Sequence, residues 1–207
     1  MFGCYKSQNS SNSVNLCQQL IVVIATENSH QAVMSAYQRD SLGHWYLLLE
    51  PMPAVVGEKG LTKEKVEGDL KTPSGLFPLL QVFGDKRHAT MNMPFIELSS
   101  TLEAIDDPLS KHYNLLIDRK NTNDVDWKSS EKLEALYRLG IVIGYNTEHR
   151  IPGKGSCIFL HSWKNKDQGT LGCVAVAHKH MEKMTSLLQH SLHPHILVAT
   201  NTFFTTQ

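Results

Sequence analysis

The sequence lacks a long apolar run and has no excess of either charge. The apolar run LIVVIA at residues 20–25 is much shorter than the ~20 apolar residues that a membrane helix needs. We therefore expect no membrane span. The 20 basic residues equal the 20 acidic ones, so the charge balance gives no indication of nucleic acid or an anionic surface as a partner.

Metal, phosphate and disulfide signatures are also missing. The sequence has 11 histidines, but no H-x-x-x-H or H-E-x-x-H spacing that would place them as ligands. We expect no metal and no cofactor. The GEKG at 57–60 lacks the strand–helix context of a phosphate loop. Cys4, Cys17, Cys157 and Cys173 fit neither a zinc site nor a dense disulfide framework. Cys157, in an apolar segment, is expected to be buried and inert.

Composition divides the chain into a short leader and one domain. Residues 1–19 are polar and rich in Ser and Asn, which predicts a disordered leader. They lack the ~7–15 apolar residues of a secretory signal, so no export signal is expected. Residues 20–207 are long enough for a single domain with a sizeable core. The loop 57–75, rich in Gly, Lys and acid, is too polar for the core and indicates a functional or disordered segment.

Short apolar and β-branched segments separated by turn residues predict a mainly-β, sandwich-like domain with one or two packed helices. The expected helices are Ser129–Leu139 and His178–Ser191, the second with a core stripe that includes Met181 and Met184. The expected strands are Leu20–Ala25, Ala32–Gln38, Trp45–Leu49, Leu76–Phe83, Tyr113–Ile117, Ile141–Tyr145, Cys157–Ser162, Cys173–Val176 and Ile196–Ala199.

His161 ends one apolar run and Cys173 begins another, with the polar loop 163–172 between them. If the two runs form neighbouring strands, the loop brings both side chains to one rim. An imidazole beside a thiol can take its proton and leave the nucleophilic thiolate. Gly172 permits a tight turn that exposes backbone N–H groups to a developing oxyanion. Together these groups predict acyl transfer, whereas each side chain alone is equally compatible with packing.

These residues resemble the active-site motif of the L,D-transpeptidase catalytic domain (YkuD-like) family. That motif has a histidine, a spacer, then a small hydroxyl residue, a variable position, glycine, cysteine and an aliphatic residue, as in 161–174 here. EGDLKTPSGLFPL (67–79) resembles the family's upstream block. IDDPLSKHYNLLID (105–118) and GYNTEHRIPGKGSCIFLHSW (144–163) are similar to blocks of one bacterial branch. The resemblance implies an L,D-transpeptidase-like β-sandwich of mixed sheets with one or two packed helices.

The resemblance also implies catalytic roles. Cys173 would attack the carbonyl between an L-centre and a D-centre of a peptidoglycan stem peptide or muropeptide, forming a thioester and releasing the terminal D-amino acid. His161 would be the base, with its ring oriented by the backbone carbonyl of Ser162. The N–H groups of Gly172 and Cys173, with that of Leu171, would form the oxyanion hole.

Further residues are candidates for substrate contact. Thr170 and Leu171 adjoin the nucleophile, and the Trp163 ring either forms one side of the cleft or packs. Tyr145 and Asn146 are an aromatic–amide pair that either lines a peptide groove or ends a strand.

Two positions depart from the family pattern and leave substrate detail open. Many members have histidine where this chain has Leu171, and arginine or asparagine where it has Ala175. An amine acceptor makes the enzyme an L,D-transpeptidase, whereas water makes it an L,D-carboxypeptidase. A non-catalytic peptidoglycan-binding module is a third interpretation, although a binder has no need of the His161–Gly172–Cys173 set. The resemblance implies the cell envelope or periplasm, whereas the missing export signal is compatible with the cytoplasm. The oligomeric state stays open.

Overall fold

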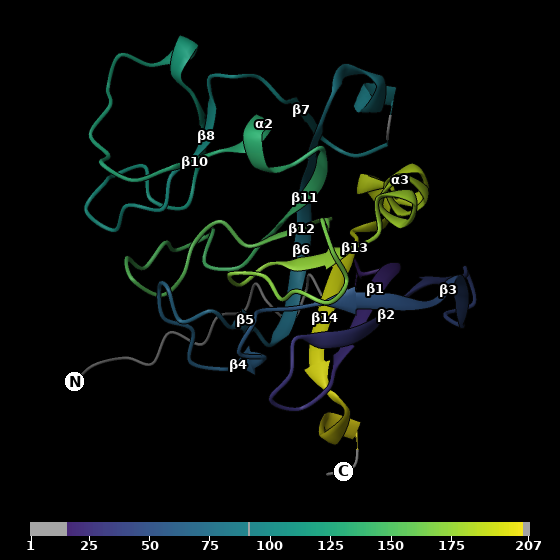
Figure 1. The fold of residues 1–207 in the computed structure, drawn as a ribbon. Coiled ribbons are helices and arrows are strands. Elements are labelled where there is room, and N and C mark those ends of the chain that lie inside the picture. Colours follow the sequence, from purple (N-terminus) through teal and green to yellow (C-terminus); the bar gives the residue numbers. More distant parts are fainter. Residues whose placement is uncertain (1–15, 91, 205–207) are drawn as a thin grey trace, which may run out of the picture.

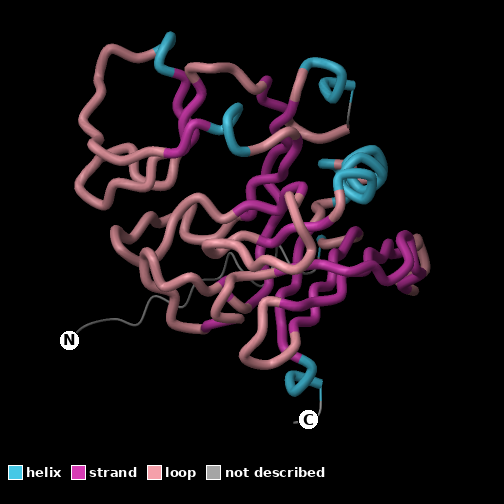
Figure 2. Tube along the Cα trace, in the orientation of Figure 1, coloured by secondary structure: helices cyan, strands magenta, loops and turns pink. Residues whose placement is uncertain are grey.

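The structure, a computed structural model, describes residues 16–90 and 92–204. Strands dominate it (Figure 2). The strands are β1 (Gln19–Ala25), β2 (Gln31–Arg39), β3 (Trp45–Val55), β4 (Leu61–Thr62), β5 (Thr72–Pro73), β6 (Gly75–Gly84), β7 (Phe95–Glu97), β8 (Leu102–Ala104), β9 (Leu116–Asp118), β10 (Glu131–Lys132), β11 (Leu139–Ile143), β12 (Phe159–Ser162), β13 (Val174–Val176) and β14 (His195–Thr200). The α-helices are α2 (Leu133–Leu136) and α3 (His178–Leu187), and short 3-10 turns are η1 (Lys86–Thr90), η2 (Arg119–Asn121), η3 (His190–Leu192) and η4 (Asn201–Phe204).

The main sheet is mixed and closes on itself. Its strand order is β11-β12-β13-β3-β2-β1-β14-β6-β7, and β11 also pairs with β6. Side chains alternate between the two faces of a strand, and β1 shows this as an alternation of buried and partly buried residues. The inward side chains of β1, β2, β6, β11 and β14 form the large core cluster. The prediction of a mainly-β fold of mixed sheets with a packed helix is confirmed.

The connection between β6 and β11 is a long segment, residues 85–138, which we call the excursion. The two strands that it joins are themselves paired. Gly84 at the end of β6 lies opposite Leu139 at the start of β11. Within the excursion, β7 joins the main sheet, whereas β10, β8 and β9 form a separate three-stranded sheet. Figure 1 shows this second sheet at the top of the view, beyond β11 and β12. A smaller apolar cluster links it to the main sheet through Leu133 and Phe159.

Helix α3 packs against β11 and β12, with Met181 and Met184 fully buried. The predicted helix at 178–191 is therefore confirmed as far as Leu187. It ends there because the chain becomes extended at Leu188.

The predicted helix Ser129–Leu139 is wrong over most of its length. Glu131 and Lys132 pair as β10 with β8, only 133–136 turn helically, and Leu139 already belongs to β11. A helix of this length is marginal by itself, so strand pairing at both ends decides the conformation. Tyr113 and Asn114 are also outside β9, because Asn114 adopts a left-handed turn with φ of 60°.

Residues 1–15, including Cys4, lie outside the described part, so the predicted disorder of the leader stays a prediction there. The remaining leader residues are ordered against the domain: Cys17 is buried and Gln19 begins β1. In the part of the chain that the structure describes, no helix has the length and apolar character to cross a membrane.

Candidate active site

Strands β12 and β13 place His161 and Cys173 on the same face of the sheet. The two strands are parallel, with His161 opposite Ala175 and Leu160 opposite Val174, so Phe159 lies opposite Cys173. Leu160 and Val174 point into the large core. Phe159 and Cys173 point to the other face and belong to the smaller cluster. Because side chains alternate, His161 shares that second face with Cys173.

The Cys173 thiol is buried and touches mainly backbone. Its Sγ accepts the Phe159 N–H at 3.3 Å and donates to the Cys157 carbonyl at 3.5 Å. Burial, and secondarily the carboxylate of Glu131, raise the pKa of Cys173 to about 12; the Phe159 N–H, Lys65 and the Tyr137 hydroxyl oppose that increase. At neutral pH the side chain is therefore a thiol in the resting protein.

The His161 ring is oriented by its neighbour's backbone. Nδ1 lies 3.0 Å from the Ser162 carbonyl oxygen. Because a carbonyl only accepts, Nδ1 carries the proton and Nε2 has the free lone pair. Burial lowers the pKa of His161 to about 4, although the Ser162 carbonyl acts in the opposite direction. The ring is thus neutral at pH 7, with Nε2 available as a base.

His161 and Cys173 line one cleft of about 450 Å³. Diagonal neighbours on adjacent strands lie about 7–8 Å apart, with their Cβ atoms somewhat closer, which is within reach of aromatic and long side chains. Among the described residues no hydrogen bond joins the two side chains, so the resting site holds them as separate neutral groups facing the same space.

The turn that carries Cys173 is fixed by two threonines. The Thr170 and Thr72 hydroxyls donate to the Cys173 carbonyl at 2.6 and 3.0 Å. Thr170 Oγ1 also accepts the Gly172 N–H at 3.1 Å. Gly172 has φ of 154°, and a Cβ there would lie 3.2 Å from the Lys71 carbonyl, so glycine is required.

This geometry changes the expected oxyanion hole. The Gly172 N–H is already bonded within the turn, contrary to its expected role as a free donor. In the described part of the chain, the Cys173 N–H has no backbone acceptor outside the strand ladders, which makes it the remaining candidate donor of the turn. Thr170 likewise turns its hydroxyl into the protein, where it holds the turn.

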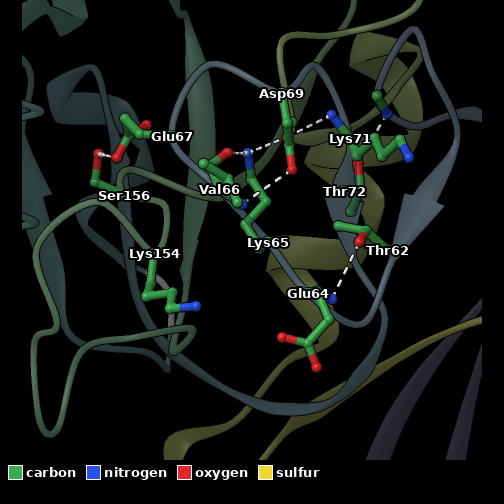
Figure 3. A network of polar contacts seen from close by, with 12 residues as sticks. Thr62, Glu64, Lys65, Val66, Glu67, Asp69, Lys71, Thr72, Lys154 and Ser156 are labelled. Carbon is green, nitrogen blue, oxygen red and sulfur yellow. Dashed lines mark hydrogen bonds and ion pairs between the residues drawn. The ribbon is translucent and has the colours of Figure 1, made fainter.

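The long polar loop 57–75 forms another side of the cleft. Its Asp69 carboxylate accepts the Val66 and Lys71 N–H groups at 3.0 and 2.8 Å and the Lys65 ammonium at 2.6 Å. Figure 3 shows these bonds converging on Asp69. The loop is therefore ordered by its own charged side chains and lies against the Cys173 turn.

Glu131 and Tyr137, from the excursion, complete the cleft and were not among the predicted site residues. The Tyr137 hydroxyl donates to Glu131 at 3.1 Å, and its ring lies 4.7 Å from the His161 ring, centroid to centroid. Burial raises the pKa of Glu131 and that of Tyr137. Both residues lie in the segment Ser129–Leu139, whose pattern predicts a helix and gives no indication of a site.

The remaining predicted residues divide into two groups. Trp163 and Leu171 line the cleft, and Leu171, 73% exposed, lies at its rim. Tyr145 and Asn146 are not among the lining residues. The Asn146 amide instead holds its own loop, donating to the Ile151 and Gly155 carbonyls at 3.1 and 2.9 Å. Among the described residues, no group of three or more His, Cys, Asp or Glu is arranged to hold a metal.

A parallel strand pair that aims a histidine and a cysteine into one cleft, within a mainly-β domain, agrees with a family match over most of the chain. The model of the L,D-transpeptidase catalytic domain (YkuD) family matches residues 20–196. The chain belongs to this family.

A search of curated proteins finds no match. Among solved structures, the chain is similar to Mycobacterium tuberculosis L,D-transpeptidase 1, with 13% sequence identity and a TM-score of 0.37. The similarity covers 87% of this chain and 62% of that one. The chain thus spans less than two thirds of the other protein's length.

Proposed function

We propose that the protein is a cysteine-dependent L,D-transpeptidase that acts on peptidoglycan stem peptides in the cell envelope. The observation that carries the proposal is the placement of His161 and Cys173 on one face of β12 and β13, lining one cleft. Family membership supplies the substrate class.

In the first half-reaction, the Cys173 sulfur attacks the carbonyl carbon between the L-centre and the D-centre. As the S–C bond forms, Nε2 of His161 takes the thiol proton, and the carbonyl electron pair moves onto oxygen. The Cys173 N–H is available to stabilise that oxygen. When the C=O bond re-forms, the C–N bond breaks, and His161 returns the proton to the departing amine. The product is a thioester on Cys173.

In the second half-reaction, the amine of an acceptor peptide attacks the thioester carbon. His161 accepts a proton from this amine and delivers it to the departing sulfur, which restores the thiol. With water in place of the amine, the same steps give an L,D-carboxypeptidase.

The resting protonation states define when the proton moves. A thiol with a pKa of about 12 and an imidazole with a pKa of about 4 are both neutral at pH 7. We therefore expect proton transfer to accompany attack on the substrate and no preformed thiolate–imidazolium pair. The Phe159 N–H, 3.3 Å from the sulfur, stabilises the negative charge as it develops.

Intact-protein mass spectrometry tests the proposal. After incubation with a stem tetrapeptide or a carbapenem, we expect an acyl adduct on the wild-type protein and none on Cys173→Ala. His161→Ala should slow acylation by about 10²-fold, the scale of lost general-base catalysis. Turnover by Cys173→Ala would refute the assignment. Released products then distinguish transfer to an amine from hydrolysis, and a protein that binds the peptide without any adduct is a binding module.

A further inference from the structure

Lys65 is a buried cation beside the candidate nucleophile. Its side chain is only 3% exposed, yet it lines the cleft together with Gly172 and Cys173. Gly155 makes room for it, and Gly172 lies beside it. A Cβ at Gly155 would lie 2.6 Å from the Lys65 Cγ, and one at Gly172 would lie 3.5 Å from its Cε. The lysine stem is therefore held between the two turns that flank the site.

The ammonium is fixed in place with one donor to spare. Nζ donates to Asp69 Oδ1 at 2.6 Å and to the Val66 carbonyl at 3.0 Å, as Figure 3 shows. An ammonium has three donors, and the structure gives the third no partner among the described residues. Asp69 is itself held by backbone N–H groups, so the cation is preorganised.

The charge of the cleft makes this position distinctive. Glu67, Asp106 and Glu131 supply carboxylates, whereas the other lysine that lines the cleft, Lys164, is exposed. Ala175, beyond the nucleophile on β13, is buried and apolar. An anionic group that enters next to Cys173 therefore meets Lys65 as the buried cation of the cleft lining.

We propose that Lys65 determines specificity by binding the free α-carboxylate of the D-residue on the leaving side of the scissile bond. This inference rests on the proposed function, in which a terminal D-amino acid is released. That carboxylate is separated from the scissile carbonyl carbon by only a nitrogen and a Cα, a span of roughly 4 Å. A cation packed against Gly172, the residue before the nucleophile, lies within reach of it.

Binding measurements in the Cys173→Ala background test the proposal without requiring turnover. The ligands are a stem tetrapeptide that ends in D-alanine and the same peptide with a C-terminal amide, and the readout is the Kd by calorimetry. A charged hydrogen bond contributes about ten- to a hundred-fold in affinity. We expect Lys65→Met to weaken binding of the acid by that factor and to leave binding of the amide unchanged.

Two further variants separate recognition from folding. Lys63→Met changes an exposed lysine of the same loop and should alter neither Kd. The double variant Lys65→Met/Asp69→Asn removes the half-buried carboxylate that would otherwise lose its partner, and should show the same selective loss for the acid.

Equal weakening of acid and amide by the double variant, or no weakening, would overturn the role of Lys65. The proposed function fails separately, if the wild-type protein forms no acyl adduct. Selective binding of the acid through Lys65 would then still stand as carboxylate recognition.

Discussion

Replacing Tyr137 with alanine should change the pH dependence of acylation. The Tyr137 ring packs against the His161 ring, with 4.7 Å between the ring centroids. Burial lowers the pKa of His161 to about 4 from an ordinary 6.5. This difference corresponds to about 3 kcal/mol in favour of the neutral ring. Tyr137→Ala admits solvent to the imidazole, so we expect its pKa to rise toward 6.5.

The sign follows from the protonation state of the base. Only neutral His161 accepts a proton, so acylation is lost as the pH falls through its pKa. At pH 5 a ring with a pKa of about 4 is roughly nine-tenths neutral, whereas one at 6.5 is about 3% neutral. Relative to pH 8, Tyr137→Ala should therefore lose about 30-fold in acylation rate at pH 5, and the wild type almost nothing.

The assay is single-turnover acylation by a carbapenem between pH 4 and 8. Tyr137→Phe is the matched control, because it keeps the ring that covers His161 and removes the hydroxyl, which bonds to Glu131 and interacts with Cys173. Circular dichroism at each pH checks that the variants stay folded. A wild-type acid limb near 6.5, or an identical limb in wild type and Tyr137→Ala, would refute the argument that burial sets the basicity of His161.

Three further substitutions test the support of the site. Gly172→Ala introduces a side chain where φ is 154° and the facing loop is 3.2 Å away, so the acylation rate should fall by about 10²-fold through misplacement of the nucleophile. The control Gly153→Ala, at a positive φ in open space, should acylate normally. Equal acylation rates in the two variants would contradict this account. Thr72→Val removes a buried hydroxyl with two backbone partners and should lower the free energy of unfolding, measured in urea, by about 1–3 kcal/mol. The control Thr62→Val removes a bond to an exposed amide and should change that free energy little. Comparable decreases in stability for the two variants would be inconsistent with the role of burial. Gly140→Ala places a Cβ against the ring of Phe83 in β6 and should lower the free energy of unfolding by about 1–3 kcal/mol. An unchanged urea midpoint would instead show that the ring moves aside at no cost.

Local sequence patterns were sufficient for the strands that supply the nucleophile and the base. His161 ends one apolar run and Cys173 begins the next, and in a parallel pair such positions lie toward opposite ends of the ladder. The two side chains are neighbours only because the paired segments are short, which leaves Cys173 two register positions from the partner of His161. The register that puts both on one face is a property of pairing, which composition does not encode. The match over 20–196 agrees with the family resemblance of the motif.

The part of the cleft formed by Glu131 and Tyr137 could not be predicted from local sequence patterns. Glu131 is strand because β8 pairs with it, and β8 is distant in sequence, so the helix-like spacing of its neighbours was misleading. Asn146 was a candidate either for a peptide groove or for the end of a strand, and its amide closes a local turn. The sequence does not distinguish Lys65 from the other lysines of the loop 57–75. Only its packing beside Gly155 and Gly172 in the structure does so.

The pairing of Gly84 with Leu139 has an evolutionary consequence. Since the ends of the 85–138 insertion are adjacent partners in a ladder, a tight hairpin can replace the whole segment with the register of β6 and β11 preserved. A change in the length or sequence of that segment would therefore alter the surroundings of Glu131 and Tyr137 without altering the pairing of β6 with β11.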